Sequence, residues 1–492
     1  MTLFCISHKY HYEIENVIRL FLPFQKITVL KEKSNCEGDF LYTEKIEEDN
    51  KTILVSEFRF GNAEYSDKKE YYDITDNDAE LKLAAMVLKQ FISQFRIKPN
   101  WGIVTGVRPS KLMASVIEEV GEENAVAYFT EKFLAKPEKA RLAFSVAKAE
   151  EKVIATAQGN SFSLYISIPY CPTRCSYCSF VSHSISNEKA KELIPDYIEK
   201  LCEELKETAV IARDNGLYLK SIYWGGGTPT TLSAEQLDVI LTEIENDFDL
   251  SECVEYTVEA GRPDTITKEK LEVLKKHNVG RISINPQTFN DSVLKEIGRM
   301  HTSKETVEKY TLAREVGFDV INMDLIAGLP TDTKEGFRNS IEKAIALNPE
   351  NITVHTLSLK RSSTIVTEDE KNGLDASITS DMVEYAIKRL TENGYKPYYM
   401  YRQSKSLGNL ENVGWCKENK ECFYNVYMME ECQTILSVGA GSVIKLKEPD
   451  GKYIERIFNF KFPFEYVSRF SELIERKRRI NEFFKEYPIK RG

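Results

Sequence analysis

The sequence lacks several features that would assign it to a large class of proteins. It has no run of about 18 apolar residues, the length that a membrane-spanning helix needs. Its first residues do not form the basic-then-apolar pattern of a secretion signal. It has no excess of positive charge either, because the formal net charge is −10, whereas general nucleic-acid binders present a basic field. These absences predict a cytoplasmic protein with no membrane span and no nucleic-acid partner.

The chain does have the length and composition of a large globular protein. Its 492 residues exceed the size of one ordinary domain, and its hydrophobic (42%) and charged (29%) fractions are those of soluble domains. Ten cysteines without a secretion signal indicate a reducing compartment, where thiols bind metal or remain free. We therefore expect a multidomain protein.

Changes of pattern along the chain predict three domains. Residues 1–150 mix strand and helix patterns and are interpreted as an N-terminal α+β domain. Residues 160–365 repeat βα units, which predicts an α/β domain with a parallel sheet. Residues 370–492 form a C-terminal extension that is mostly helical, with an aromatic strand at 395–401.

Six short apolar runs in the central region predict six parallel strands separated by helices. Six units are too few for a closed eight-stranded barrel, so we expect a partial (β/α)6 barrel. Barrels place their chemistry at the C-terminal ends of the strands. The predicted strands cover residues 164–168, 221–225, 254–260, 281–285, 320–326 and 352–358.

The first predicted strand leads into three closely spaced cysteines, Cys171, Cys175 and Cys178. Three thiolates on one loop suit a metal ion or an iron–sulfur cluster. A cube is usually held by four thiolates, so a cube on three would leave one iron open to another ligand. The alternative is a structural zinc site with His183 as the fourth ligand. Spacing alone leaves the two interpretations close to even.

A glycine-rich turn follows the second predicted strand, in Tyr223-Trp-Gly-Gly-Gly-Thr-Pro229. Its glycines would let a ligand approach the backbone, and we expect free N–H groups that bind a carboxylate or a similar group. A tight loop with no ligand is the usual explanation of such a turn. Its position one βα unit after the cysteines instead indicates a partner site for the open corner of the cluster.

The cysteine loop, the glycine loop and the partial barrel together resemble the radical S-adenosylmethionine (SAM) enzymes. This resemblance implies a [4Fe–4S] cluster on Cys171, Cys175 and Cys178, whose open iron binds SAM. One electron from the cluster then cleaves SAM to a 5′-deoxyadenosyl radical, which abstracts a hydrogen atom from the substrate. The pairing of the two motifs favours the cluster over zinc.

The stretches 165–171, 224–229 and 322–330 resemble the oxygen-independent coproporphyrinogen III oxidase group. The segments 101–110 and 401–414 are similar to its HemZ-type branch. The resemblance implies an oxidoreductase of porphyrin and heme biosynthesis, a coproporphyrinogen dehydrogenase that decarboxylates two propionates of coproporphyrinogen III and gives protoporphyrinogen IX. It also implies a tetrapyrrole substrate and an electron donor such as flavodoxin or ferredoxin.

The same resemblance implies roles for individual residues. The residues expected to act in catalysis are Tyr165, Gln287 and Arg299. The residues expected to contact the cluster-bound SAM are Tyr165, Gly226 and Glu259. The positions that match a second SAM site are Gly227, Thr228, Gln287, Arg299, Asp324 and Ser358.

Structural roles are the alternatives for several of these residues. Glu259 would then form a barrel-stabilising ion pair, and Arg299 would be a surface arginine of a loop. His355 in the sixth strand is either an active-site residue or part of the core, and His301 is expected to be an ordinary loop histidine. The cysteines outside the motif have no interpretable spacing and are expected to be free thiols. The basic run 476–479 is expected to be a solvated helix face.

Two departures from the oxidase pattern leave the substrate open. Ser167 stands where the oxidase has an active-site histidine, and Ser179-Phe180 stands where it has Gly-Cys. These departures favour a second hypothesis, radical chemistry on another tetrapyrrole. A third hypothesis is a heme-binding delivery protein without turnover. The segment 421–425 fits poorly to the histidine-containing motif of the related heme chaperones, which counts against it.

Overall fold

A computed structural model describes residues 1–23, 25–180, 182–358, 375–403 and 406–489. The chain divides into two compact units. The first comprises Met1–Phe144 with Tyr401–Glu411, and the second comprises Ser145–Met400 with Asn412–Gly492. The three-domain division stays a prediction, and its boundary between the barrel and the C-terminal extension lies outside the described residues.

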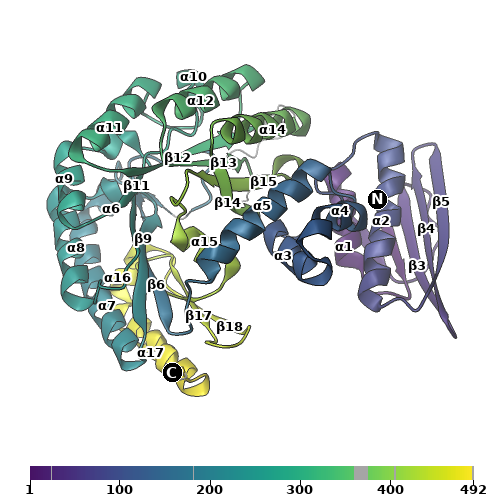
Figure 1. The fold of residues 1–492 in the computed structure, drawn as a ribbon, viewed down its shortest axis with the longest axis horizontal. Helices are drawn as coiled ribbons and strands as arrows, with labels where there is room; N and C mark the ends of the chain where they lie inside the picture. The colour runs from purple at the N-terminus through teal and green to yellow at the C-terminus, as the bar shows by residue number, and fades with distance from the viewer. Residues whose placement is uncertain (24, 181, 359–374, 404–405, 490–492) are drawn as a thin grey trace. The chain divides into compact units, whose positions relative to one another are not determined.

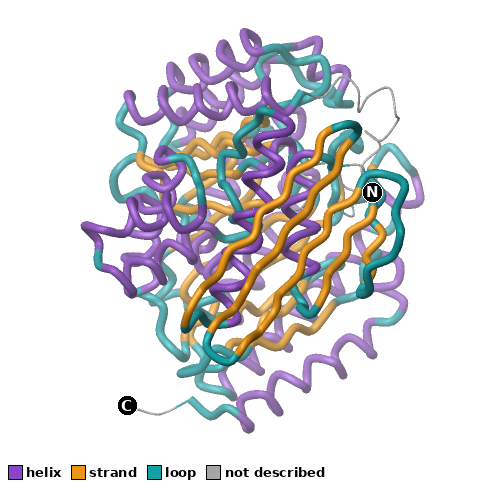
Figure 2. Tube along the Cα trace, turned by 90° about the vertical axis from the view of Figure 1, so that its right-hand side faces the viewer, coloured by secondary structure: helices purple, strands orange, loops and turns teal. Residues whose placement is uncertain are grey.

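A five-stranded mixed sheet in the order β2-β1-β3-β4-β5 forms the first unit's sheet, and its long strands run side by side in Figure 2. Residues 31–39 are loop, and the chain then forms β3, which pairs antiparallel with β4. The strands are β1 (Thr2–Ile6), β2 (Thr28–Leu30), β3 (Phe40–Glu48), β4 (Lys51–Phe60) and β5 (Ala63–Tyr72).

Helix α2 covers this sheet with an apolar face. It begins after Thr75, whose Oγ1 accepts a hydrogen bond from Asp78 N at 3.1 Å and so caps the first turn. Its buried Phe91 stacks on Phe58 of β4 with ring centroids 4.2 Å apart. The helices that begin in this unit are α1 (His11–Phe21), α2 (Asp76–Phe95), α3 (Pro109–Val120), α4 (Glu122–Phe133) and α5 (Pro137–Ile154).

The segment Tyr401–Glu411 packs within the first unit although it is distant in sequence. Trp101 Nε1 donates a 2.7 Å hydrogen bond to Glu411 Oε2, and Lys139 forms a buried ion pair with the same carboxylate. The two segments that resemble the HemZ-type branch are therefore joined by a buried hydrogen bond.

The six predicted barrel strands are present in the second unit, and each pairs in parallel with the next. They are β6 (Ser161–Ile168), β9 (Tyr218–Gly226), β10 (Glu255–Glu259), β11 (Arg281–Ser283), β12 (Val320–Ala327) and β13 (Asn351–Thr356). Short strands β7 (Tyr170–Cys171) and β8 (His183–Ser184) form a separate pair after β6. The partial barrel is thus confirmed.

The predicted helices follow these strands and lie along the outside of the arc of strands in Figure 1. Ser233 and Thr302 start α8 and α11 with capping boxes, in which the cap and the third helical residue bond each other's backbone. The helices are α6 (Glu188–Glu192), α7 (Ile194–Asp214), α8 (Ala234–Asp247), α9 (Lys268–Lys276), α10 (Asp291–Glu296), α11 (Ser303–Val316) and α12 (Lys334–Leu347).

The C-terminal region adds strands to both sides of the barrel sheet. β15 (Glu411–Cys416) pairs antiparallel with β13, and β16 (Thr434–Val438) pairs in parallel with β6. With β14 (Lys396–Arg402), β17 (Val443–Lys447) and β18 (Ile454–Phe458), the sheet has eleven strands. The remaining helices are α14 (Ala376–Glu392), α15 (Phe423–Glu430), α16 (Pro463–Ser468) and α17 (Phe470–Glu486). The region holds more helix than strand, as predicted. Of its strands, only β14 was predicted from the sequence.

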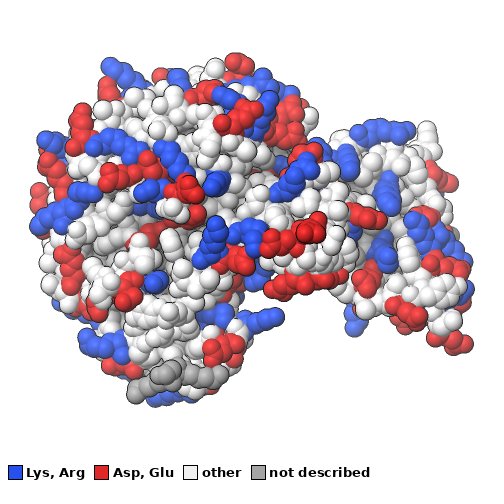
Figure 3. Space-filling model, viewed as in Figure 1, with Lys and Arg blue, Asp and Glu red and all other residues white. Residues whose placement is uncertain are grey.

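Lysine, arginine, aspartate and glutamate side chains are interspersed over the face drawn in Figure 3. The basic run 476–479 lies on α17 and was expected to be solvated, yet the side chain of Lys477 is only 2% exposed. That expectation is wrong for Lys477, because a buried carboxylate pairs with it. Among the helices that the structure describes, none has both the length and the apolar character that crossing a bilayer requires.

Candidate active site

The three cysteines lie on a loop that begins at β7, directly after β6. β7 pairs in parallel with β8, so the two ends of the loop lie side by side. Thr173 Oγ1 donates a 3.0 Å hydrogen bond to Gly298 O, which fastens the loop to the turn after α10. The backbone N–H of Ser176 bonds the carbonyl of Ile297 in the same turn, at 3.1 Å. The loop is therefore held at both its base and its outer part.

The thiols of this loop suit an iron–sulfur cube. Cys171, Cys175 and Cys178 are free and enclosed to different degrees. Burial raises the pKa of Cys178 to about 11, and burial also raises the pKa of Cys171, so thiolates here need nearby positive charge. Arg262 Nη1 lies 3.6 Å from Cys175 Sγ and supplies one such charge. Three thiol donors beside a guanidinium fit a cube that has one corner free of protein.

His183, the fourth ligand in the zinc alternative, lies on β8 beside the loop. Its ring packs edge-on against Phe462, with centroids 6.0 Å apart. Within the described part of the chain, no three Cys, His, Asp or Glu side chains are gathered as a single metal ion requires. This finding covers the three thiols as well as His183, so it does not distinguish the zinc alternative from the cluster.

Glycines at the end of β9 are required by the close approach of two backbone segments. Gly226 has φ +98°, and a Cβ atom on it would lie 2.8 Å from Ser167 Oγ. A Cβ atom on Gly227 would lie 2.5 Å from the carbonyl oxygen of Tyr170. A side chain at either position would have to displace the strand that carries the cysteine loop.

The amides of the glycine loop are bonded to that neighbouring strand. Gly227 N donates to Ile168 O at 2.7 Å, and Thr228 N donates to Tyr170 O at 2.8 Å. The expectation of free N–H groups is therefore wrong at these two positions. The hydroxyl of Thr228 lies 3.5 Å from Cys171 Sγ, so the glycine loop and the cysteine loop are in direct contact.

Tyr165 and Glu259 converge inside the barrel. Tyr165 stacks with Tyr223 and with Tyr424 of α15, at centroid distances of 6.3 and 5.8 Å. Tyr223 Oη donates to Glu259 Oε1 at 2.7 Å. A Cβ atom on Gly225 would lie 3.2 Å from both Tyr165 Oη and Glu259 Oε1. These atoms therefore meet at the glycine loop.

Burial raises the pKa of Glu259 to about 7, and the Asp324 charge adds to this effect. Among the described residues Glu259 forms no ion pair, so the alternative of a barrel-stabilising pair is not supported. Its carboxyl group is therefore partly protonated and partly ionised near neutral pH.

Asp324 on β12 is the most fully hydrogen-bonded acid of the site. Asn285 Nδ2 and Asn322 Nδ2 donate to its two oxygens at 2.7 and 2.8 Å. His355 Nε2 lies 3.7 Å from Oδ2. Burial alone would raise the pKa of Asp324, but the neighbouring His355 and the hydrogen bond from Asn322 outweigh burial and hold this pKa below its usual range. His355 is thus beside the predicted site rather than in the apolar core.

Arg299 and Gln287 complete the group of polar residues. Arg299 is 7% exposed, so it is not a surface arginine; its Nη1 donates to Asn285 O at 2.7 Å and its Nε to Tyr177 Oη at 3.2 Å. Gln287 has φ +64°, and its buried Oε1 has no hydrogen-bond partner in the described structure. A strained backbone and an unsatisfied polar atom together are typical of ligand sites. Ser358 lies two residues beyond the end of β13.

Several residues of this region were not predicted from the sequence. Asn285 binds Asp324, Tyr424 stacks on Tyr165, and Arg262 contacts the cysteine loop. Asn285 and Arg262 follow strand ends, so their positions could have indicated a role in the site. Tyr424 lies on α15, which is distant in sequence, and no local pattern connects it to Tyr165. His301, expected to be a loop histidine, is buried near Arg299, and burial lowers its pKa to about 3.

The remaining cysteines form no disulfide bonds in the described part of the chain, in agreement with the expectation from the sequence. They are Cys5, Cys36, Cys202, Cys253, Cys416, Cys422 and Cys432.

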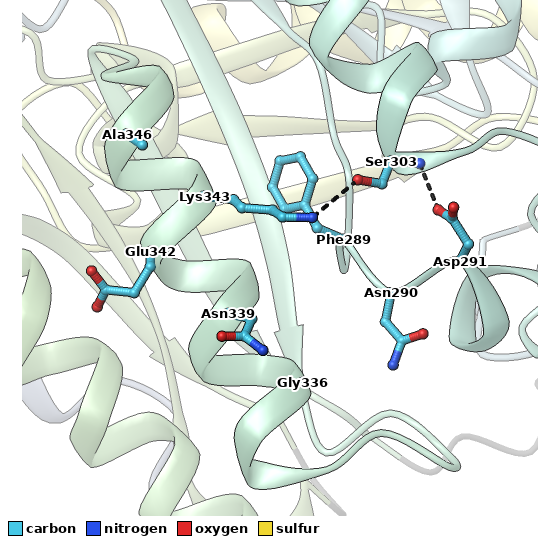
Figure 4. Close-up of a pocket in the computed structure, with 9 residues that line it drawn as sticks. All are labelled: Phe289, Asn290, Asp291, Ser303, Gly336, Asn339, Glu342, Lys343 and Ala346. Carbon is cyan, nitrogen blue, oxygen red and sulfur yellow. Dashed lines mark hydrogen bonds between the residues drawn. The ribbon is translucent and has the colours of Figure 1, made fainter.

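A pocket of 570 Å³ is lined by residues of α10, α11 and α12 and of the segment before α10 (Figure 4). Lys343 Nζ reaches across it to Ser303 Oγ at 3.5 Å. Its lining residues are Phe289, Asn290, Asp291, Ser303, Gly336, Asn339, Glu342, Lys343 and Ala346. No residue expected to bind the cluster or SAM lines it.

Comparison with solved structures supports the fold. Coproporphyrinogen III oxidase (HemN) from Escherichia coli, a radical SAM enzyme, matches with a TM-score of 0.52 and 21% sequence identity. The match covers 67% of this chain and 73% of that chain. It shows a shared fold.

Comparison with protein families and curated proteins identifies the relatives. The radical SAM superfamily model matches residues 165–344. The oxygen-independent coproporphyrinogen-III oxidase-like protein HemZ of Bacillus subtilis (strain 168) is 35% identical over 478 residues, which are 95% of this chain and 94% of that protein. The heme chaperone HemW of Escherichia coli (strain K12) is 29% identical over 59% of this chain and 72% of its own length. The chain therefore belongs to the radical SAM superfamily, whose cofactors are a [4Fe–4S] cluster and SAM, and within it to the HemZ-type coproporphyrinogen III oxidase-like proteins.

Proposed function

We propose that this protein is a radical SAM oxidoreductase that decarboxylates two propionate side chains of coproporphyrinogen III and forms protoporphyrinogen IX without oxygen. The observation that carries the proposal is the similarity to the HemZ protein over nearly the whole of both chains. When bound, the cluster supplies one electron and SAM supplies the radical that removes a hydrogen atom from the propionate. The propionate radical would then lose carbon dioxide and pass one electron to a one-electron acceptor, which would leave the vinyl group.

In this proposal the cysteine loop and the first glycine positions bind the cofactors. Cys171, Cys175 and Cys178 hold the cluster. Tyr165 and Glu259 contact the cluster-bound SAM, together with Gly226. The convergence of Tyr165 Oη and Glu259 Oε1 at Gly225 supports this assignment, because it gathers an aromatic ring and an acid beside the loop.

A second SAM would contact residues at the ends of the later strands. Gln287, Arg299 and Asp324 are linked through Asn285 and the β11–β12 backbone, which supports a common ligand for them. The unsatisfied Oε1 of Gln287 is available to accept a hydrogen bond from that ligand. The other expected contacts are Gly227, Thr228 and Ser358.

One observation favours a second candidate function, radical chemistry on a different tetrapyrrole. Ser167 takes the position of the oxidase histidine, and its hydroxyl donates to Ala440 O at 2.8 Å. The Ser167 side chain is thus engaged by backbone and cannot replace an imidazole. Heme binding without turnover is a third possibility, which the similarity to heme chaperones over part of the chain supports.

An anaerobic assay distinguishes these functions. The reconstituted protein is incubated with SAM, a reductant and coproporphyrinogen III, and both 5′-deoxyadenosine and porphyrinogen products are measured. Protoporphyrinogen with 5′-deoxyadenosine supports the oxidase. SAM cleavage without protoporphyrinogen rejects it in favour of another substrate, and tight heme binding without SAM cleavage supports a delivery protein. A flavodoxin or ferredoxin in place of the chemical reductant tests the proposed electron donor.

A further inference from the structure

Arg262 lies against the cysteine loop from the end of β10. Its side chain is only 3% exposed. Nη1 lies 3.6 Å from Cys175 Sγ and 3.3 Å from Thr173 O, and Nη2 lies 3.1 Å from Thr173 Oγ1. A guanidinium has five N–H donors. Three of them are therefore directed at the loop that carries the cluster ligands.

The other two donors bind Asp264. Arg262 Nε lies 3.0 Å from Asp264 Oδ1, and Nη2 lies 2.9 Å from Oδ2. A two-pronged pair of this kind fixes the plane of the guanidinium. Because every N–H has an acceptor, Asp264 orients Arg262 so that its opposite edge faces Thr173 and Cys175.

We propose that Arg262 is a positioning residue for the iron–sulfur cluster, which holds Cys175 in place and raises the reduction potential of the cluster. One-electron reduction adds a negative charge to the cluster. A guanidinium in a buried site stabilises that charge more than it stabilises the oxidised form, because the surroundings screen it poorly. Hydrogen bonds to cluster sulfur atoms act in the same direction.

The same contacts hold the loop in place through protein atoms alone. Arg262 binds both the carbonyl and the hydroxyl oxygen of Thr173, and that hydroxyl donates in turn to Gly298 O. Thr173 is thus held between the end of β10 and the turn after α10. This inference concerns the cofactor alone and does not depend on which tetrapyrrole is the substrate.

The test is a redox titration of the reconstituted protein, followed by the EPR signal of the reduced cluster. Arg262→Met removes the charge and the hydrogen bonds, and we expect at least a tenfold fall in the one-electron reduction constant, a shift of 59 mV to lower potential. Arg262→Lys keeps the charge and is expected to fall between wild type and Arg262→Met.

Arg281→Met is the matched control. Arg281 is also a buried arginine of the barrel, 7% exposed, but it lies at the start of β11 and binds Glu421 O at 2.8 Å. Its replacement is expected to leave the potential unchanged. The proposal is overturned if Arg262→Met keeps the wild-type potential or if Arg281→Met shifts it equally. If Arg262→Met retains no cluster, Arg262→Lys decides, because a wild-type potential in that variant also overturns the proposal.

Discussion

Lys477 Nζ lies 2.9 Å from Glu204 Oε1, and both side chains are almost completely withdrawn from solvent. The pair joins α17, near the end of the chain, to α7 of the first βα unit. Glu204 also accepts hydrogen bonds from Gly439 N and Tyr466 Oη, at 2.8 and 2.6 Å. The C-terminal helix is therefore fastened to the barrel by a buried charge with several donors.

Replacing Lys477 by Met should destabilise the protein by about 3 to 5 kcal/mol, because the Glu204 carboxylate would stay buried without its cation. Arg478→Met is the control, since its side chain is 75% exposed on the same helix and should change stability by less than about 0.5 kcal/mol. Anaerobic urea denaturation of both variants measures the difference. Equal stabilities would show that the pair contributes nothing to the fold.

Cys175→Ala should abolish the cluster, because two thiolates remain where the cube needs three protein ligands. We expect iron and sulfide content to fall severalfold after reconstitution, with loss of SAM cleavage. Cys202→Ala removes a free thiol of α7 and should leave the iron content unchanged. Iron and sulfide analysis with absorption spectra checks both, and an intact cluster in Cys175→Ala would contradict the ligand assignment.

Gly227→Ala should weaken SAM binding at least tenfold, about 1.4 kcal/mol. The new Cβ atom would lie 2.5 Å from Tyr170 O and would push the glycine loop away from the cysteine loop. Gly280→Ala is the control, because nothing lies within 4 Å of a Cβ atom there. Anaerobic calorimetry of the reconstituted proteins measures SAM affinity. Wild-type affinity in Gly227→Ala would argue against a role for this loop.

Glu259→Gln should change how stability depends on pH. The pKa of Glu259 is raised to about 7 in the folded protein from 4.5. The unfolded chain therefore ionises first, and stability falls as the pH rises from 4.5 to 7. The loss, on the order of 3 kcal/mol, is complete above pH 7. Glutamine does not titrate, so the variant should gain stability relative to wild type over this range. Urea denaturation of the cofactor-free proteins at pH 4.5 to 8 tests this, and parallel pH profiles would contradict it.

The barrel could be predicted closely because its strands are short apolar runs that alternate with amphipathic helices. β6, β9 and β12 lie within a few residues of the predicted strands. The pairing of β16 with β6 could not be predicted in this way, because no local pattern connects segments so far apart. The predicted site residues follow strand ends, where barrels place their chemistry. This rule comes from the fold and not from the local sequence.

The contacts that define the site were less accessible from the sequence. The bond between Asn285 and Asp324 and the burial of Lys477 depend on which side chains face each other in three dimensions. The amides of Gly227 and Thr228 were expected to be free because a glycine-rich turn does not reveal which strand lies beside it. Composition and spacing therefore predicted the type of ligand, but they did not predict the residues that orient it.

The parallel pairing of β16 with β6 also determines when the barrel can be completed during synthesis. Phe162 of β6 pairs with Thr434, and Ser167 bonds Ala440, 273 residues later. At about 5 to 20 residues per second, a ribosome needs roughly 15 to 55 seconds to make that interval. Until then one edge of the strand that precedes the cysteine loop is unpaired and open to aggregation. Insertion of iron and sulfide into a fully supported loop therefore has to follow translation of the C-terminal region.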